Sequence, residues 1–258
     1  MKRTGLRLLP LLLSLVLLVS CAQAPELELT EEGYVHEKTG VAYVPADAYY
    51  EAIAIDRDLV IARIANDKID DDLFYAIDGV ASEQMIATER YEIFCAVDKT
   101  LPTLAQMSPW RALICKTATL SYSVASIEEE ADLKTLLGVY AMQGFPEDDL
   151  YCDDLTPEQY DIKFESSEHP AFYYVLKYRS FSSEVLVYEV IADENDFIAT
   201  YPGVPVTTET FEDEVYAVYH FGTGLLYDQV THTYYPVGTL IQDYLDGAEV
   251  EGTGTGEA

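Results

Sequence analysis

Residues 171–178 (AFYYVLKY) and 184–192 (EVLVYEVIA) form two runs that are rich in aromatic and β-branched side chains. Such side chains are typical of strands on a half-buried pleated sheet. Hydrophobic alternation of this kind continues along the chain without a regular exchange of strand and helix patterns, which disfavours a parallel α/β fold. The sequence therefore predicts an α+β fold that consists mainly of antiparallel β-sheet.

Further strand patterns lie on both sides of these runs. Residues 33–45 predict a hairpin that returns at Gly40, and residues 52–65 predict two strands joined by a turn at 56–58. The other predicted strands cover residues 73–77, 91–97, 112–119, 120–125, 161–165, 215–221 and 225–228. The 21 tyrosines agree with this prediction, because on a strand the ring packs and the hydroxyl stays in water. A surface rich in tyrosine can also bind glycans or peptides.

One helix is predicted over about 126–141. Ser126 and Glu129 have the spacing of a capping box, and the acidic residues of the first turn interact favourably with the helix dipole. An apolar stripe follows at helical spacing. Two shorter helices are predicted, at 82–88 and at 239–245.

The first residues of the chain combine a positive segment with an apolar run. Lys2, Arg3 and Arg7 provide the charge, and residues 6–19 are almost wholly apolar. A spanning helix needs about 20 apolar residues, so this run is too short and the layout predicts a secretory signal. An ordinary secretory signal with an incidental cysteine at its end is one interpretation of this segment.

The signal ends in the sequence LVSC at 18–21, which resembles the lipobox of bacterial lipoproteins. The resemblance covers residues 1–21 only. It implies that residues 1–20 form a lipoprotein signal peptide and that Cys21 receives a diacylglycerol thioether, so that acyl chains such as palmitate anchor the protein. The implied location is the extracytoplasmic face of the cell membrane, within the cell envelope.

The rest of the chain divides by composition. Residues 21–32 form the lipidated cysteine and a short polar tether, 33–246 a single α+β domain, and 247–258 a disordered tail. A break near 145–158 is the alternative to one domain.

The charge is strongly acidic. The signal carries three of the 15 Lys and Arg and none of the 46 Asp and Glu, so the mature chain has a net charge of 12 − 46 = −34. Such a surface repels nucleic acid and anionic lipid headgroups. It favours cations and basic partners, although a solvated acidic coat is the simpler interpretation.

Three cysteines follow Cys21. Cys95 and Cys115 lie in apolar, strand-like runs and form a possible disulfide, which an extracytoplasmic location permits. Buried thiols explain the same pattern equally well. Cys152 is then the odd cysteine.

The sequence shows no motif for catalysis or for a fixed metal site. No Gly-x-Ser-x-Gly elbow occurs, and neither Cys152 nor His169 has a catalytic motif around it. His220 and His232 lie close in sequence with Asp228 between them, but polar positions on a wet sheet face explain them better than zinc ligands do. No catalytic residue and no metal ligand is therefore assigned.

Calcium is the one cofactor for which ligands are plentiful, because it prefers oxygen. Acidic clusters lie at 70–72, 147–149, 153–154 and 193–196. None matches the spacing of an EF-hand loop, so solvated turns are the first interpretation and calcium sites the second.

Together with the anchor, these observations predict a non-enzymatic binding or scaffolding module of the cell envelope. Its partners would be the membrane, through Cys21, and an envelope protein, a glycan or a cation; nucleic acid is not expected. The alternative is an extracytoplasmic hydrolase that acts on peptide or glycan through two carboxylates. With 46 acidic residues in the chain, the sequence singles out no such pair.

Overall fold

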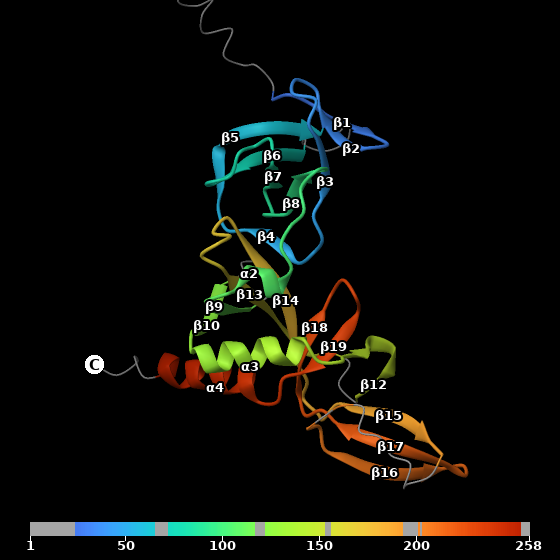
Figure 1. Ribbon diagram of the computed structural model, residues 1–258. Helices are drawn as coiled ribbons and strands as arrows, with labels where there is room; N and C mark the ends of the chain where they lie inside the picture. Colours follow the sequence, from blue (N-terminus) through green and yellow to red (C-terminus); the bar gives the residue numbers. More distant parts are fainter. Residues whose placement is uncertain are drawn as a thin grey trace, which may run out of the picture. The chain divides into compact units, whose positions relative to one another are not determined.

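The computed structural model describes residues 24–64, 72–116, 122–152, 156–192, 201 and 203–253, with side chains up to 248 (Figure 1). The described chain is mostly antiparallel β-sheet with few helices, which confirms the predicted β-rich class. It divides into two compact units. The first unit combines the described residues up to Val44 with Ile55–Arg90 and Phe94–Lys99, and the second combines Pro45–Ala54, Tyr91–Ile93 and the chain from Thr100 onward.

The borders of these units do not coincide with the predicted break. The alternative boundary near 145–158 falls inside the second unit. The single α+β domain predicted for 33–246 stays a prediction.

The first unit is a seven-stranded sheet in the order β1-β2-β3-β8-β7-β6-β5. Its strands are β1 (Leu27–Thr30), β2 (Gly33–His36), β3 (Ala42–Pro45), β5 (Ile55–Ile64), β6 (Asp72–Ile77), β7 (Met85–Thr88) and β8 (Ile93–Ala96). Leu27, Tyr43, Phe74 and Ile86 meet in its core. The predicted hairpin is confirmed, because β2 and β3 pair antiparallel and Gly40 returns the chain with a φ of 71°, a region that favours glycine.

Two predictions in this unit are wrong. The turn expected at 56–58 does not form, because residues 55–64 make the single strand β5, whose ladder with β6 contains register shifts. Residues 82–88 contain the strand β7 instead of a helix. Ile86 and Ala87 are buried there beside β6, and this packing outweighs a weak helical pattern.

The second unit contains an eight-stranded sheet. Its strands follow the order β10-β9-β13-β14-β18-β19-β11, and β4 pairs with β14 beside this path. They are β4 (Tyr50–Ala52), β9 (Arg111–Lys116), β10 (Tyr122–Ile127), β11 (Phe145–Pro146), β13 (Glu158–Glu165), β14 (Phe172–Ser180), β18 (Gly224–Asp228) and β19 (Thr233–Pro236). The described helices are α2 (Leu104–Met107), α3 (Glu130–Tyr140) and α4 (Leu240–Thr253), and a 3₁₀ turn, η1, covers Glu147–Asp149.

The helix predicted at 126–141 starts later and lacks the predicted cap. Ser126 lies in β10, where its backbone pairs with β9, and its hydroxyl donates a hydrogen bond to Glu128. The helix α3 begins after Glu129, whose side chain makes no capping hydrogen bond. The capping box is therefore wrong, because strand pairing holds Ser126 away from the helix terminus.

The predicted C-terminal helix is longer than expected. The helix α4 continues through Gly247 to Thr253, so the tail predicted for 247–258 begins inside a helix. Ile241 and Leu245 are buried on its inner side, at the spacing of one helix face.

A four-stranded sheet completes the second unit, in the order β12-β15-β17-β16. It consists of β12 (Leu150–Tyr151), β15 (Leu186–Ile191), β16 (Val206–Phe211) and β17 (Glu214–His220), and Figure 1 shows β16 at one edge. The sequence patterns do not predict β16. It is joined to β17 by Glu212 and Asp213, whose φ angles of 48° and 71° are those of a type I′ hairpin turn.

Within the described residues, no helix has both the length and the apolar composition to cross a membrane. The predicted signal peptide, the lipobox and Cys21 lie outside the described residues, so the lipid anchor stays a prediction.

Candidate functional site

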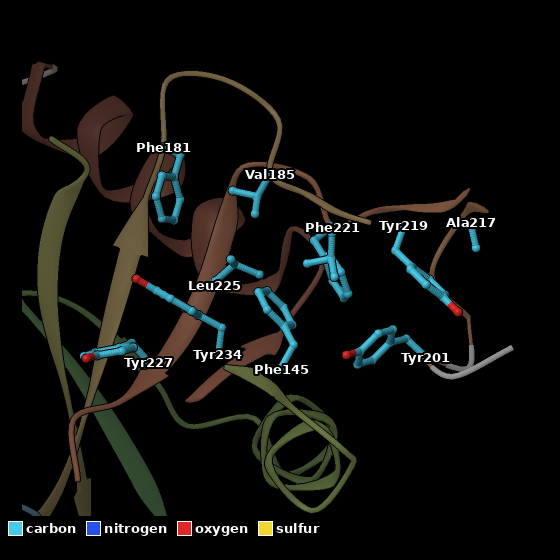
Figure 2. Packing of buried hydrophobic residues seen from close by; sticks show 11 residues of the cluster. Phe145, Phe181, Val185, Tyr201, Ala217, Tyr219, Phe221, Leu225, Tyr227 and Tyr234 are labelled. Carbon is cyan, nitrogen blue, oxygen red and sulfur yellow. The ribbon is translucent and has the colours of Figure 1, made fainter. Parts of the chain in front are cut away.

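The two faces of the four-stranded sheet have different surroundings. One face is buried, because Val187 and Tyr219 point into a core that they share with Phe145 and Tyr234 of the eight-stranded sheet. Figure 2 shows Phe145 between Tyr234 and Phe221, with ring centroids 5.7 and 4.4 Å away. This core fixes which face of the small sheet is turned outward.

The outward face carries a group of exposed and half-buried aromatic and apolar side chains. Partners across an antiparallel ladder share a face, and Val190 pairs with Tyr216, which in turn pairs with Glu209. Alternation along the strands adds the other members. We call the group the tyrosine face; it consists of Tyr151, Tyr188, Val190, Phe211 and Tyr216. Tyr151, Val190 and Phe211 are 58 %, 60 % and 50 % exposed.

The rings of the tyrosine face hold one another in place. Tyr188 lies at the centre, and its ring centroid is 5.7 Å from that of Tyr151 and 6.3 Å from those of Phe211 and Tyr216. All three contacts are edge-to-face, an arrangement that aromatic pairs favour. The rings are therefore positioned before any partner arrives, which lowers the entropy lost on binding.

The sheet that carries the tyrosine face has acidic residues but no Lys or Arg. Its strands contain Glu189, Glu209 and Glu214. No Lys or Arg follows Arg179 anywhere in the sequence. Carboxylates beside open aromatic rings attract cations, both by charge and by the negative ring face.

The phenols of Tyr188 and Tyr216 stay protonated at neutral pH, because the pKa of each is raised. A hydrogen bond of 2.7 Å from the Tyr216 hydroxyl to Glu214 raises the pKa of Tyr216. Burial, and then the charge of Glu209, raise the pKa of Tyr188. The face consequently offers neutral rings and hydroxyl groups together with separate carboxylates.

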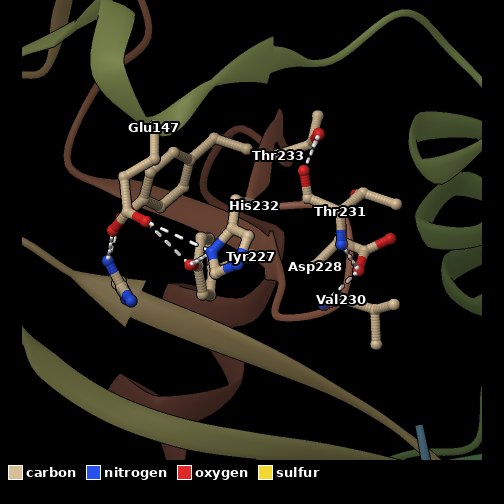
Figure 3. Close-up of polar contacts among 9 residues, drawn as sticks. Glu147, Tyr227, Asp228, Val230, Thr231, His232 and Thr233 are labelled. Carbon is tan, nitrogen blue, oxygen red and sulfur yellow. Dashed lines mark hydrogen bonds and ion pairs between the residues drawn. The ribbon is translucent and has the colours of Figure 1, made fainter. Parts of the chain in front are cut away.

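A second group of polar residues surrounds the hairpin between β18 and β19 (Figure 3). We call it the hairpin cluster; it consists of Glu147, Arg179, Tyr227, His232 and Tyr234. Arg179 donates to a Glu147 oxygen at 2.8 Å and to the Tyr234 hydroxyl, and its guanidinium carbon lies 3.8 Å from the centre of the Tyr227 ring. Burial raises the pKa of Glu147, but the hydrogen bonds from Arg179 and Tyr227 outweigh it and leave the pKa below its usual value.

Within the hairpin cluster, Tyr227 links Glu147 to His232. The Tyr227 hydroxyl donates to Glu147 at 2.8 Å and lies 2.8 Å from Nδ1 of His232. Since the one hydroxyl proton goes to Glu147, the neutral tautomer that fits has the proton on Nδ1 and leaves Nε2 as an acceptor. The His232 side chain is 70 % exposed, and its backbone has a φ of 53°.

Asp228 lies on the same hairpin but is buried and fully bonded. Its oxygens accept hydrogen bonds from the Tyr49 hydroxyl, at 2.7 Å each, and from the backbone amides of Val230 and Thr231, at 2.9 and 3.0 Å. Figure 3 shows the carboxylate folded back onto these amides. The arrangement is that of an Asx turn that staples the hairpin.

The structure does not bring the two histidines and Asp228 together. His220 contacts Glu184 through Nδ1 at 3.2 Å and Thr207 through Nε2 at 3.0 Å, whereas His232 belongs to the hairpin cluster. No group of three His, Cys, Asp or Glu among the described residues is arranged to hold a metal ion.

The other candidate residues also have separate surroundings. Cys152 contacts Ser183, and the ring of His169 stacks on Phe172. Cys95 and Cys115 are buried and lie in different compact units, and the disulfide between them stays a prediction. Burial raises the pKa of Cys95 to about 11, so this thiol is unreactive at neutral pH.

The acidic clusters proposed as calcium ligands are described only in part. Glu147, in the cluster at 147–149, is bound to Arg179. The clusters at 153–154 and 193–196, and most of the one at 70–72, lie outside the described residues. Calcium binding stays a prediction.

The tyrosine face could not be found from the sequence without β16. Tyr188 and Tyr216 lie in strands that are predicted, but Phe211 lies in one that is not. The residues VTTETF at 206–211 are of types that favour a strand. The hairpin was missed because the turn that follows contains no glycine to mark it.

No protein-family model matches this chain, and comparisons with curated proteins and with solved structures find no similar protein.

Proposed function

We propose that this protein is a lipid-anchored, extracytoplasmic binding module of the cell envelope that holds a basic partner on its tyrosine face. The observation that carries the proposal is the set of mutually packed rings, two of them exposed and two half-buried, on a sheet without Lys or Arg. No chemical step is required of such a face, so the proposal describes binding and not catalysis.

The apolar part of the tyrosine face supplies the binding energy. Burial of apolar surface favours association, and contiguous exposed apolar patches on soluble domains commonly mark interaction sites. Tyr151, Val190 and Phe211 each have half or more of their surface open to water. Their neighbours already fix the rings, so little rotamer freedom is lost on binding.

The acidic charge supplies the selectivity. Glu209 and Glu214 lie on the same face as Tyr216, and a cationic group above the rings gains about 0.5–1 kcal/mol at an exposed site. The net charge of −34 for the mature chain, calculated as 12 − 46, also speeds the encounter with basic partners. The same charge repels anionic headgroups, which favours a module held away from the membrane on its tether.

The lipobox resemblance supports the anchor. Two acyl chains on Cys21 would hold the chain stably, since each buried methylene contributes about 0.8 kcal/mol and a single chain is marginal. The module and the anchor are separate parts of the proposal, and each has its own test.

The face is tested by capture from envelope extract with the full chain in a mild neutral detergent. The double variant Tyr188→Ser/Phe211→Ser removes the centre of the tyrosine face. The matched control is Tyr122→Ser, which removes a tyrosine that is 55 % exposed on β10 of the other sheet. We expect recovery of basic partners to fall with the double variant and with added salt, but not with the control. Equal recovery by all three proteins would reject the proposal.

A second candidate function, an extracytoplasmic hydrolase, is favoured by one observation. The link from Glu147 through Tyr227 leaves Nε2 of the exposed His232 as an acceptor, which is the state that a general base needs. Turnover in a panel of peptides and glycans that disappears in His232→Gln, with unchanged stability, would support a hydrolase. Absence of turnover by the unaltered chain would leave the hairpin cluster as a structural ion pair.

A further inference from the structure

The strand β16 is the last strand of its sheet, and among the described residues no strand pairs with its outer edge. All six of its residues are exposed. Figure 1 shows β15 and β17 on one side of it only. An edge strand of this kind carries a row of backbone groups that can pair with another chain.

The register identifies which backbone groups face outward. The amide of His220 donates to the carbonyl of Pro205 at 2.9 Å, so this is a hydrogen-bonded position of the β16–β17 ladder. Such positions recur at every second residue in an antiparallel pair. Thr207 and Glu209 therefore direct their backbone groups toward β17, whereas Thr208 and Thr210 direct theirs to the open edge.

Within the described residues, β16 shows none of the features by which natural edge strands prevent pairing. Natural edge strands are protected by Lys, by Pro, by a bulge or by shortness. The sequence of β16 is VTTETF, with no Lys or Pro, and its ladder with β17 has no register shift. Thr, Val and Phe also favour an extended backbone. The strand is therefore suited to accept a neighbour.

The surrounding charges determine the chemistry of that neighbour. An added strand would place every second side chain beside Glu209 and Phe211, at the border of the tyrosine face. A Lys or Arg at those positions would form both an ion pair with the Glu209 carboxylate and a cation–π contact with the Phe211 ring. A second copy of this chain carries the same strongly negative charge, and an antiparallel pair of β16 strands centred on Glu209 would set two carboxylates opposite each other, which is unfavourable.

We propose that β16 binds an extended, lysine- or arginine-rich polypeptide segment as a fifth strand of the four-stranded sheet. The inference rests on the proposed function and names its partner class. Backbone hydrogen bonds to Thr208 and Thr210 give the segment its extended form, and the tyrosine face selects its basic side chains.

A short fluorescent peptide of alternating lysine and valine tests the inference on the full chain in neutral detergent. Fluorescence anisotropy measures affinity, and hydrogen exchange measures protection of the Thr208 and Thr210 amides. We expect binding that protects both amides. The same peptide with N-methyl groups along one edge keeps its charge but cannot pair, and we expect it to bind about tenfold more weakly or worse.

A substitution at the edge gives a second measurement. Thr208→Pro removes an outward donor and leaves the ladder with β17 intact, whereas Thr208→Val keeps the donor and serves as the matched control. We expect about a tenfold loss of peptide affinity for the proline variant and less than about a twofold change for the valine variant.

The outcomes separate the inference from the proposed function. If the N-methylated peptide binds as well as its parent, or if no amide is protected, strand addition is wrong. In that case, loss of affinity in Tyr188→Ser/Phe211→Ser would still support the basic-partner module. If the double variant binds as the unaltered chain does, the proposed function itself fails. Self-association that Thr208→Pro abolishes would assign the edge to a second copy of this chain and overturn the basic partner.

Discussion

The hydroxyl of Tyr49 lies 2.7 Å from each carboxylate oxygen of Asp228, although the two residues are 179 positions apart in sequence. Asp228 is 1 % exposed, and it also receives the amides of its own hairpin turn. The Tyr49 phenol thus joins the chain before β4 to the hairpin between β18 and β19, beside the hydrogen bond of 2.8 Å that the Gln229 side chain donates to the Ala48 carbonyl. Buried carboxylates are tolerated only with such a set of donors.

Tyr49→Phe is expected to lower the free energy of unfolding by about 1–3 kcal/mol, because it leaves a buried carboxylate short of one donor. Chemical denaturation of the full chain measures the change. Tyr151→Phe is the control, since its side chain is exposed and the loss of its hydroxyl should cost almost nothing. Equal stability of the two variants would show that Asp228 does not depend on Tyr49.

The pair of Lys163 and Glu51 predicts unequal effects for its two partners. Their charged atoms lie 2.5 Å apart, and the exposed fractions of the side chains are 8 % for Lys163 and 30 % for Glu51. Glu51→Gln leaves a buried ammonium without its counter-charge, so we expect a loss of about 2 kcal/mol. Lys163→Met removes the charge and keeps the volume, so the loss should be about 1 kcal/mol or less. Equilibrium unfolding measures the loss of stability in both variants, and a larger loss in Lys163→Met than in Glu51→Gln would contradict the prediction.

The hairpin cluster predicts a dependence of stability on acid. The pKa of Glu147 is lowered in the folded protein, so its contribution is complete above the unfolded value of about 4.3 and is lost as the pH falls through the folded pKa. Because the side chain is 40 % exposed, solvent limits the effect to about 1 kcal/mol or less.

Glu147→Gln should therefore reduce stability at neutral pH and flatten the decline of stability in the acid range. Unfolding free energies measured from pH 7 downward test this. Glu28→Gln, at an exposed position of β1, is the control and should follow the unaltered chain. A steeper acid decline in Glu147→Gln would show that the sign is wrong.

The lipobox resemblance predicts a specific chemical group on Cys21. In the organism that makes the protein, labelled palmitate should enter the unaltered chain but not Cys21→Ser, and the mature chain should partition into detergent. The serine variant should carry no lipid at position 21 and should not partition in this way. Mass spectrometry of the amino terminus checks for the lipid, and an unmodified Cys21 thiol would favour the ordinary secretory signal.

The β-rich class could be predicted because periodicity reports it directly, as the confirmed hairpin at Gly40 illustrates. The prediction of the helix cap was wrong for a tertiary reason. Ser126 pairs with a residue of the neighbouring strand β9, and this pairing cannot be read from the local sequence. The tyrosine face was missed in the sequence for a local reason. Its edge strand, β16, is followed by Glu212 and Asp213, and neither residue is the glycine or asparagine that normally announces a two-residue turn.

That turn carries the last prediction. Glu212 and Asp213 both have positive φ, a conformation that costs non-glycine residues about 1 kcal/mol and that asparagine and glycine adopt readily. Glu212→Asn/Asp213→Gly should therefore raise the free energy of unfolding by about 1 kcal/mol, and it should slow hydrogen exchange in β16 and β17. Glu212→Ala/Asp213→Ala removes the same charges without relieving the backbone, so it separates strain from repulsion. A similar gain in both variants would assign the effect to the removed carboxylates, and no gain in either would mean that the four-stranded sheet does not limit the stability of its unit.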